Sequence, residues 1–243
     1  MKLFIVTGGS KGVGFELSKK LVRKGHKVAV ISRSSNSELD SNSEISYFKA
    51  DLSNLECISP VIDSLFSRFD LSQFDEVGLI NNAGAVLPIG KVENLEMDKI
   101  ILGINLNLTA SIALSSLFLE KLSQYNGVKT IFNISSGVAK RPIASWSVYS
   151  AAKAGLENFS QCLVKEYGSN LRVFNFSPGV IDTNMQETIR AQSSADFPEV
   201  DRFQALKEEG NLRTPEQVAS VICDILLGKL KTQEAFLSIS DFD

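Results

Sequence analysis

Short apolar runs alternate with segments of helical periodicity through the first third of the chain. The apolar runs are rich in valine, isoleucine and phenylalanine, have the length of buried strands, and cover Lys2–Thr7, Lys27–Ser32, Ile45–Ala50 and Glu76–Ile80. Apolar residues at helical spacing fill two of the gaps, Val13–Lys24 and Asn54–Phe69. This alternation, with short connections, predicts a parallel, doubly wound sheet whose ligand crevice lies at the carboxyl ends of its strands.

The second half of the chain continues this pattern and adds a polar insertion. Thr130–Ser135 is predicted as a buried strand, Thr214 and Pro215 as the cap and first residue of a helix, and Ala235–Ile239 as the last strand. Before that cap, residues 184–213 form a polar, mixed stretch with little regular pattern. We expect this stretch to be a substrate lid, because long excursions beside a site commonly serve as lids.

The uncharged segment Ile100–Leu119 has the length of a membrane span. It also carries Asn105, Asn107, Thr109 and several serines, which are costly in lipid and ordinary inside a protein. We therefore expect a buried helix and no membrane partner.

A glycine-rich turn, Thr7–Gly14 (TGGSKGVG), joins the first strand to the first helix. Glycines let the backbone approach a diphosphate, and a helix N-terminus offers free N–H groups and the positive end of its dipole. The spacing G-x-x-x-G-x-G differs from both the usual dinucleotide fingerprint and the P-loop. Its place between a strand and a helix still favours dinucleotide binding over a plain tight connection.

The end of the second strand distinguishes between the two nicotinamide dinucleotides. An NAD site places an acidic residue there for the ribose 2′-hydroxyl, whereas an NADP site places an arginine near the 2′-phosphate. This chain has Ser32-Arg33-Ser34 at that point, and Lys11 in the glycine turn adds a second cation. The sequence therefore predicts NADPH/NADP⁺ as the cofactor.

Asp51, after the third strand, is expected at the adenine edge or as a helix cap.

Composition narrows the class of protein. The 243 residues, 44% of them hydrophobic, suffice for one sizeable core, so a single domain is expected. The 25 basic and 28 acidic residues are interspersed, which argues against a nucleic-acid partner. Three scattered cysteines and one histidine show no metal-ligand spacing, so no metal is predicted. The lack of a signal-peptide pattern predicts a cytoplasmic location.

Candidate chemistry lies in the segment Ser135–Gly155. Tyr149 and Lys153 stand four residues apart, which in a helix places both on one face with the ammonium near the phenol. A neighbouring cation favours phenolate, so we expect Lys153 to lower the pKa of Tyr149. Ser136, at the end of the preceding strand, is expected to face the same crevice. An exposed helix pair is the alternative interpretation of Tyr149 and Lys153.

These motifs together resemble the short-chain dehydrogenase/reductase family, and the resemblance covers nearly the whole chain in order. The matching elements are TGxxxGxG at Thr7–Gly14, Asn81-Asn82-Ala83-Gly84, Asn105, Ser136, Tyr149-x-x-x-Lys153, and Pro178-Gly179 followed by Thr183. The resemblance implies a single-domain Rossmann-type α/β fold with seven parallel strands and helices on both faces. It also implies a nicotinamide cofactor and a small-molecule carbonyl substrate.

The family pattern assigns a role to each matching residue. The implied catalytic tetrad is Asn105, Ser136, Tyr149 and Lys153, with Ser136 preferred to Ser135 because its distance from the tyrosine matches the family's spacing. The implied cofactor contacts are Gly8, Ser10, Lys11, Gly12, Val13, Gly14, Arg33, Asp51, Leu52, Asn82, Ala83, Gly84, Tyr149, Lys153, Pro178, Gly179, Val180 and Thr183. By this pattern Tyr149 donates a proton, Ser136 orients the carbonyl, Lys153 holds the nicotinamide ribose, and Asn105 anchors a water.

The C-terminal third is similar to the sepiapterin reductase and benzil reductase branch of that family. Trp146 is expected to present a flat apolar wall beside the reacting carbonyl, closed from the other side by Phe197 and Phe203, although packing as ordinary core is the alternative. Ser136, Trp146 and Tyr149 are then the substrate contacts. The branch also uses an acidic residue near its C-terminus, for which Asp241 or Asp243 is available.

Two further expectations concern the whole protein. The apolar faces of Ile100–Leu119 and of the helix after Tyr149 exceed what one sheet face needs, which predicts a homodimer. The predicted function is an NADPH-dependent carbonyl reductase acting on a ketone or vicinal diketone. A non-catalytic NADP-sensing protein on the same fold is the alternative.

Overall fold

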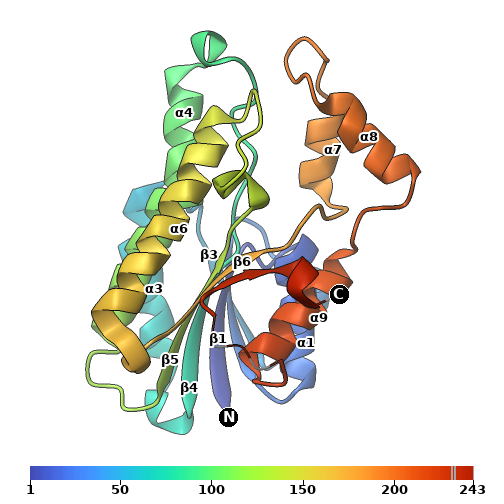
Figure 1. Ribbon diagram of the computed structural model, residues 1–243. Coiled ribbons are helices and arrows are strands. Elements are labelled where there is room, and N and C mark those ends of the chain that lie inside the picture. Colours follow the sequence, from blue (N-terminus) through green and yellow to red (C-terminus); the bar gives the residue numbers. More distant parts are fainter. Residues whose placement is uncertain (231, 233, 243) are drawn as a thin grey trace.

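The computed structural model describes residues 1–230, 232 and 234–242, and its centre is a seven-stranded parallel sheet (Figure 1). The strand order is β3-β2-β1-β4-β5-β6-β7. The strands are β1 (Lys2–Thr7), β2 (Lys27–Ser32), β3 (Ile45–Lys49), β4 (Glu76–Asn81), β5 (Val128–Ile134), β6 (Arg172–Ser177) and β7 (Phe236–Ser238). The predicted doubly wound, Rossmann-type sheet is therefore confirmed. The six strands with predicted bounds each end within two residues of the sequence pattern, and β6 is the strand for which the sequence analysis gave no range.

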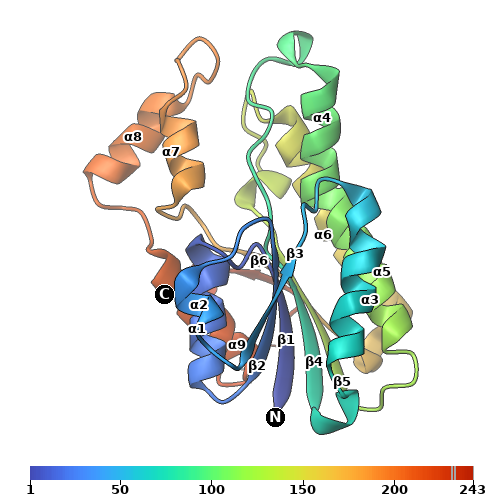
Figure 2. The ribbon, with the colours of Figure 1, turned by 180° about the vertical axis from the view of Figure 1, so that it is seen from behind.

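Helices cover both faces of the sheet (Figures 1 and 2). Strand β1 shows why both faces must be covered, since Leu3 and Ile5 belong to one buried cluster and Phe4 and Val6 to another. The first cluster is closed by α3 (Ile58–Arg68), α5 (Ala110–Lys121) and α6 (Ser147–Tyr167), and the second by α1 (Gly12–Arg23) and α9 (Pro215–Leu226). The predicted cap of α9 is confirmed, because Thr214 and Gln217 form a reciprocal capping box before Pro215.

The long uncharged helix is not continuous. It consists of α4 (Met97–Ile104), a π-helical turn η4 (Asn105–Thr109) and α5. Residues Met97–Lys121 are long and apolar enough to cross a membrane by length and composition, but a third of that window is buried within the fold. The π turn inserts a residue into the helical ladder and thereby turns Asn107 inward, where it is 1% exposed.

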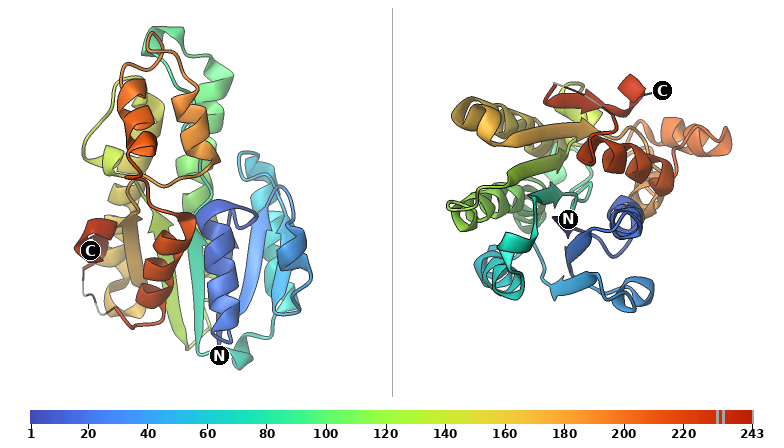
Figure 3. Two further views of the ribbon diagram at one scale, coloured as in Figure 1. Left: turned by 90° about the vertical axis from the view of Figure 1, so that its right-hand side faces the viewer. Right: turned by 90° about the horizontal axis from the view of Figure 1, so that it is seen from below.

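The segment 184–213 lies above the carboxyl ends of the strands (Figures 1 and 3). The sequence shows little regular pattern there, yet the segment contains two helices, α7 (Asn184–Arg190) and α8 (Val200–Glu208). Both ends of the segment meet at one point: the Arg213 N–H donates to the Val180 carbonyl (3.1 Å), and the Asp182 N–H donates to the Arg213 carbonyl (2.9 Å). The two helices therefore extend from a pinned base.

Candidate active site

The glycine-rich turn packs against the loop that follows β4. The Asn82 side chain donates to the carbonyls of Thr7 (2.8 Å) and Gly8 (3.3 Å), and the Thr7 hydroxyl accepts from the Ala83 N–H (3.0 Å). A Cβ at Gly14 would lie 2.6 Å from the Asn82 amide nitrogen, so no larger residue fits there. Gly8 has a φ of +67°, in the region that favours glycine.

The start of α1 is suited to an anion. Its N-cap residue, Lys11, makes no side-chain hydrogen bond to the helix, and the first turn carries no acidic residue. The helix N–H groups, including that of Val13, are therefore open to a ligand, and the dipole favours negative charge. The residues present thus fit a dinucleotide diphosphate.

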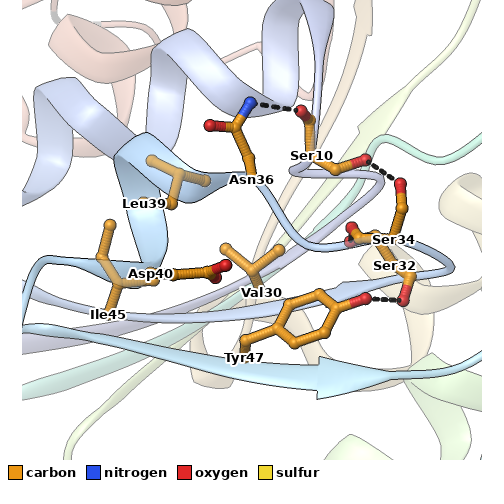
Figure 4. A pocket seen from close by; sticks show the side chains of 9 residues that line it. All are labelled: Ser10, Val30, Ser32, Ser34, Asn36, Leu39, Asp40, Ile45 and Tyr47. Atoms are coloured by element: carbon orange, nitrogen blue, oxygen red, sulfur yellow. Dashed lines mark hydrogen bonds between the residues drawn. The ribbon is translucent and has the colours of Figure 1, made fainter.

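The end of β2 lies beside this turn, as Figure 4 shows. The Asn36 amide donates to the Ser10 carbonyl (3.0 Å), and the Ser34 hydroxyl lies 3.5 Å from that of Ser10. Arg33 and Lys11 are both exposed there. The exposed residues Arg33 and Lys11 thus adjoin in sequence the two serines whose hydroxyls meet where a 2′-phosphate is predicted.

The remaining predicted cofactor residues lie along the same edge of the sheet. Asp51 accepts from the Ser53 hydroxyl (2.7 Å), which lowers the pKa of its carboxyl, and the neighbouring Leu52 is buried. After β6 the chain passes through Pro178, Gly179 and Val180, and a Cβ at Gly12 would lie 3.6 Å from the Thr183 methyl. The glycine turn and the loop after β6 are thus in contact.

Ser136 and Tyr149 meet at the end of β5. The Ser136 hydroxyl lies close enough to the Tyr149 phenol to lower its pKa, whereas Ser135 donates to the Glu157 carboxylate (3.1 Å). These contacts place Ser136, rather than Ser135, next to Tyr149. Tyr149 lies in the first turn of α6, so its phenol and the strand-end hydroxyl face one crevice.

Burial dominates the electrostatics of Tyr149 and Lys153. Burial raises the pKa of Tyr149 to about 12, opposed only by the Ser136 hydrogen bond. Burial also lowers the pKa of Lys153 to about 8. The expectation that Lys153 lowers the tyrosine pKa is wrong for this structure. The Lys153 ammonium lies 5.8 Å from the centroid of the Tyr149 ring and donates to the Ile134 carbonyl (2.8 Å). Desolvation of the phenol therefore raises its pKa more than the charge of Lys153 lowers it.

The π turn brings Asn107 to the site. Its side chain accepts from the Ala85 N–H (3.1 Å) and donates to the carbonyls of Ala85 and Gly103 (both 2.9 Å). A Cβ at Gly84 would lie 2.9 Å from the Asn107 oxygen and 3.7 Å from the Lys153 ammonium, so the three groups adjoin.

Asn105, which the sequence assigns to the tetrad, donates instead to the Ser53 carbonyl (3.4 Å). Its side chain therefore turns to the cofactor-side loop rather than to Lys153. The sequence analysis missed Asn107 because two asparagines lie two residues apart in one apolar helix, and nothing in the apolar pattern reveals the π turn.

Trp146 does not present an open wall. It is 4% exposed, Phe197 stacks on its indole at 5.0 Å with an interplanar angle of 5°, and Phe203 packs at 5.3 Å. The alternative of ordinary core packing therefore describes the indole face. Tyr149 meets the indole edge to face at 6.0 Å. We call this group the lid cluster; it comprises Val86, Val138, Trp146, Tyr149, Ile189, Phe197, Val200 and Phe203.

The C-terminal acids give no substrate contact that the structure can assign. Asp241 accepts from the Ser238 N–H (2.6 Å) within the final turn. Asp243 lies outside the described residues. The turn itself adjoins the cofactor side, since a Cβ at Gly179 would lie 3.3 Å from Ile239.

Comparison with known proteins agrees with this geometry. The family model for short chain dehydrogenases matches residues 2–194. The chain is 38% identical over 229 residues to a benzil reductase ((S)-benzoin forming) of Bacillus subtilis, covering 93% of each protein. It is 36% identical to the enzyme of that name from Bacillus cereus, covering 93% of this chain and 94% of the relative. The crystal structure of the KRED1-Pglu enzyme superposes with a TM-score of 0.84 at 27% identity, covering 98% of this chain and 100% of that one.

The fold and the crevice define an oxidoreductase that uses a nicotinamide cofactor. The chain belongs to the short-chain dehydrogenase/reductase family.

Proposed function

We propose that the protein is an NADPH-dependent carbonyl reductase that acts on a ketone or vicinal diketone. The observation that carries this proposal is the position of Ser136 beside the protonated, buried Tyr149, at the strand edge where the glycine turn offers its N–H groups. Benzil reductases among the relatives support the substrate class.

Reduction of a carbonyl leaves negative charge on oxygen, so the site must supply hydrogen-bond donors and one proton. When bound, the reduced nicotinamide supplies the hydride. Tyr149 donates the proton, and its pKa of about 12 keeps the hydroxyl protonated at neutral pH. Ser136 donates a hydrogen bond to the same oxygen. The lid cluster keeps water from the phenol, which is 6% exposed.

Lys153 and Asn107 complete the proposed tetrad. Lys153 carries its charge below about pH 8 and lies beside Gly84, in the loop expected to line the cofactor. Asn107 takes the place first assigned to Asn105, because it holds the loop at Ala85 and adjoins the ammonium. We assign it to positioning that loop and Lys153.

NADPH is proposed over NADH because Arg33 and Lys11 flank the Ser10 and Ser34 hydroxyls, with no acidic residue at the end of β2. A cytoplasmic location remains a prediction from the sequence, as does the role of 184–213 as a substrate lid.

The test is a panel of aliphatic, aromatic and vicinal carbonyl compounds, each assayed with NADPH and NADH. We expect NADPH-dependent reduction that is fastest with aromatic vicinal diketones. Tight NADPH binding with no reduction anywhere in the panel would instead favour the NADP-sensing alternative.

A further inference from the structure

The indole N–H of Trp146 is a buried donor without a partner. Trp146 is 4% exposed, and its Nε1 makes no hydrogen bond to any residue that the structure describes. Natural proteins rarely leave such groups unpaired, because a buried donor that has lost its water costs free energy. The side-chain oxygen of Gln186, on α7, is also buried and unpartnered, so these two groups do not satisfy each other.

The hydrophobic side chains that pack around the indole offer one acceptor, the Tyr149 hydroxyl. Phe197 and Phe203 pack against the indole ring and cannot accept a hydrogen bond in the plane of the N–H, so the N–H is the polar group of Trp146 that these contacts leave unsatisfied. That N–H belongs to a ring 6.0 Å from the ring of Tyr149.

We infer that the Trp146 N–H binds the second oxygen of a vicinal dicarbonyl while Tyr149 and Ser136 hold the oxygen that is reduced. The inference rests on the proposed function. The two oxygens of such a substrate are borne by adjacent carbons, so a donor next to Tyr149 reaches the second oxygen. A monoketone leaves the N–H unpaired, and the site thereby selects against it.

The hydrogen bond to the second oxygen acts mainly on binding. That carbonyl is not reduced, so its charge changes little between ground state and transition state. An interaction of equal strength in both states lowers KM and leaves kcat nearly unchanged. Loss of the indole N–H therefore raises KM for the dicarbonyl.

The test compares benzil with deoxybenzoin, which keeps both aryl rings and replaces one carbonyl by a methylene. Trp146→Phe removes the N–H and retains an aromatic ring for Phe197. In the wild type we expect benzil to have the higher kcat/KM. In the variant, kcat/KM for benzil should fall about tenfold through a higher KM, which is the size expected for the loss of one buried hydrogen bond. The kcat/KM for deoxybenzoin should change less than about threefold.

Phe203→Leu is the matched control, because it alters the same cluster without changing a polar group. Phe203→Leu should change kcat/KM for benzil and for deoxybenzoin by a similar factor. Thermal unfolding and NADPH affinity of both variants establish that the fold and the cofactor site are intact.

If the ratio of kcat/KM for benzil to kcat/KM for deoxybenzoin is the same in Trp146→Phe as in the wild type, the inference is overturned. The N–H would then bind a buried water or no partner. Wild-type reduction of both compounds would leave the proposed function standing in that case. Failure of the wild type to reduce either compound would overturn both.

Discussion

At the scale of single residues, burial moves the pKa values of the two central titratable groups apart. It raises the pKa of Tyr149 to about 12 and lowers that of Lys153 to about 8, because each charged form loses hydration. In the proposed mechanism Tyr149 therefore acts as an acid, and Lys153 acts as a cation whose charge depends on pH.

This assignment predicts a pH limb. Lys153 is charged in the folded protein below about pH 8 and neutral above it, so kcat/KM for NADPH should fall as pH rises through 8. Lys153→Arg keeps its charge at all these pH values, so any remaining activity should lack the limb. Initial rates at saturating carbonyl, measured from pH 6 to about pH 10, provide the check.

The same depressed pKa affects stability. Between about pH 8 and the ordinary lysine value the unfolded chain binds more protons than the folded one, so Lys153 makes the free energy of unfolding rise with pH in that window. A chemical-denaturation series should show that rise and its loss in Lys153→Met.

In the proposed function, Arg33 is the residue on which cofactor choice depends. Arg33→Asp should weaken NADPH binding by about 2 kcal/mol or more, since it removes a charge-assisted pair and adds a repulsive carboxylate. NADH affinity serves as the internal control and should not weaken. Titration of both cofactors by fluorescence measures the effect, and a variant with its NADPH preference intact would remove Arg33 from the site.

At the scale of elements, the π turn η4 decides which asparagine serves the site. Asn107 makes three hydrogen bonds to the loop after β4 and to Gly103, whereas Asn105 makes one, to Ser53. Asn107→Ala should therefore lower kcat/KM at least about tenfold, and Asn105→Ala less than about threefold. The reverse order in steady-state kinetics would restore Asn105 to the tetrad.

Elements with strong local signals were predictable from the sequence. The glycine turn follows from TGGSKGVG between a strand and a helix, and the start of α9 follows from Thr214-Pro215. The arrangement of 184–213 was not, because the segment is polar and Phe197, between α7 and α8, is buried through tertiary contacts with Trp146 and Phe203. The same contacts cover the indole face predicted to be open.

At the scale of the whole molecule, α4 and α6 each expose two large apolar side chains. Met97 and Ile101 on α4 are 67% and 49% exposed, and Val164 and Tyr167 on α6 are 38% and 37% exposed. An exposed apolar surface of this kind favours association with a second copy through a two-fold axis.

We predict a homodimer on this basis. Light scattering at micromolar concentration should give twice the 26.5 kDa chain mass. Ile101→Glu should shift the protein toward monomer, while Val92→Glu, on an exposed residue outside both helices, serves as a control for added charge. A wild-type monomer under these conditions would contradict the prediction.

The central claim is that Tyr149 delivers the proton in carbonyl reduction, and a single-turnover comparison of wild type and Tyr149→Phe tests it most directly. Each protein is saturated with NADPH and mixed with benzil, and loss of the reduced nicotinamide is followed by absorbance. We predict unchanged NADPH affinity and a reduction rate at least about 100-fold lower in the variant, in keeping with the loss of a general acid. A variant that reduces benzil within about tenfold of the wild-type rate would contradict the account.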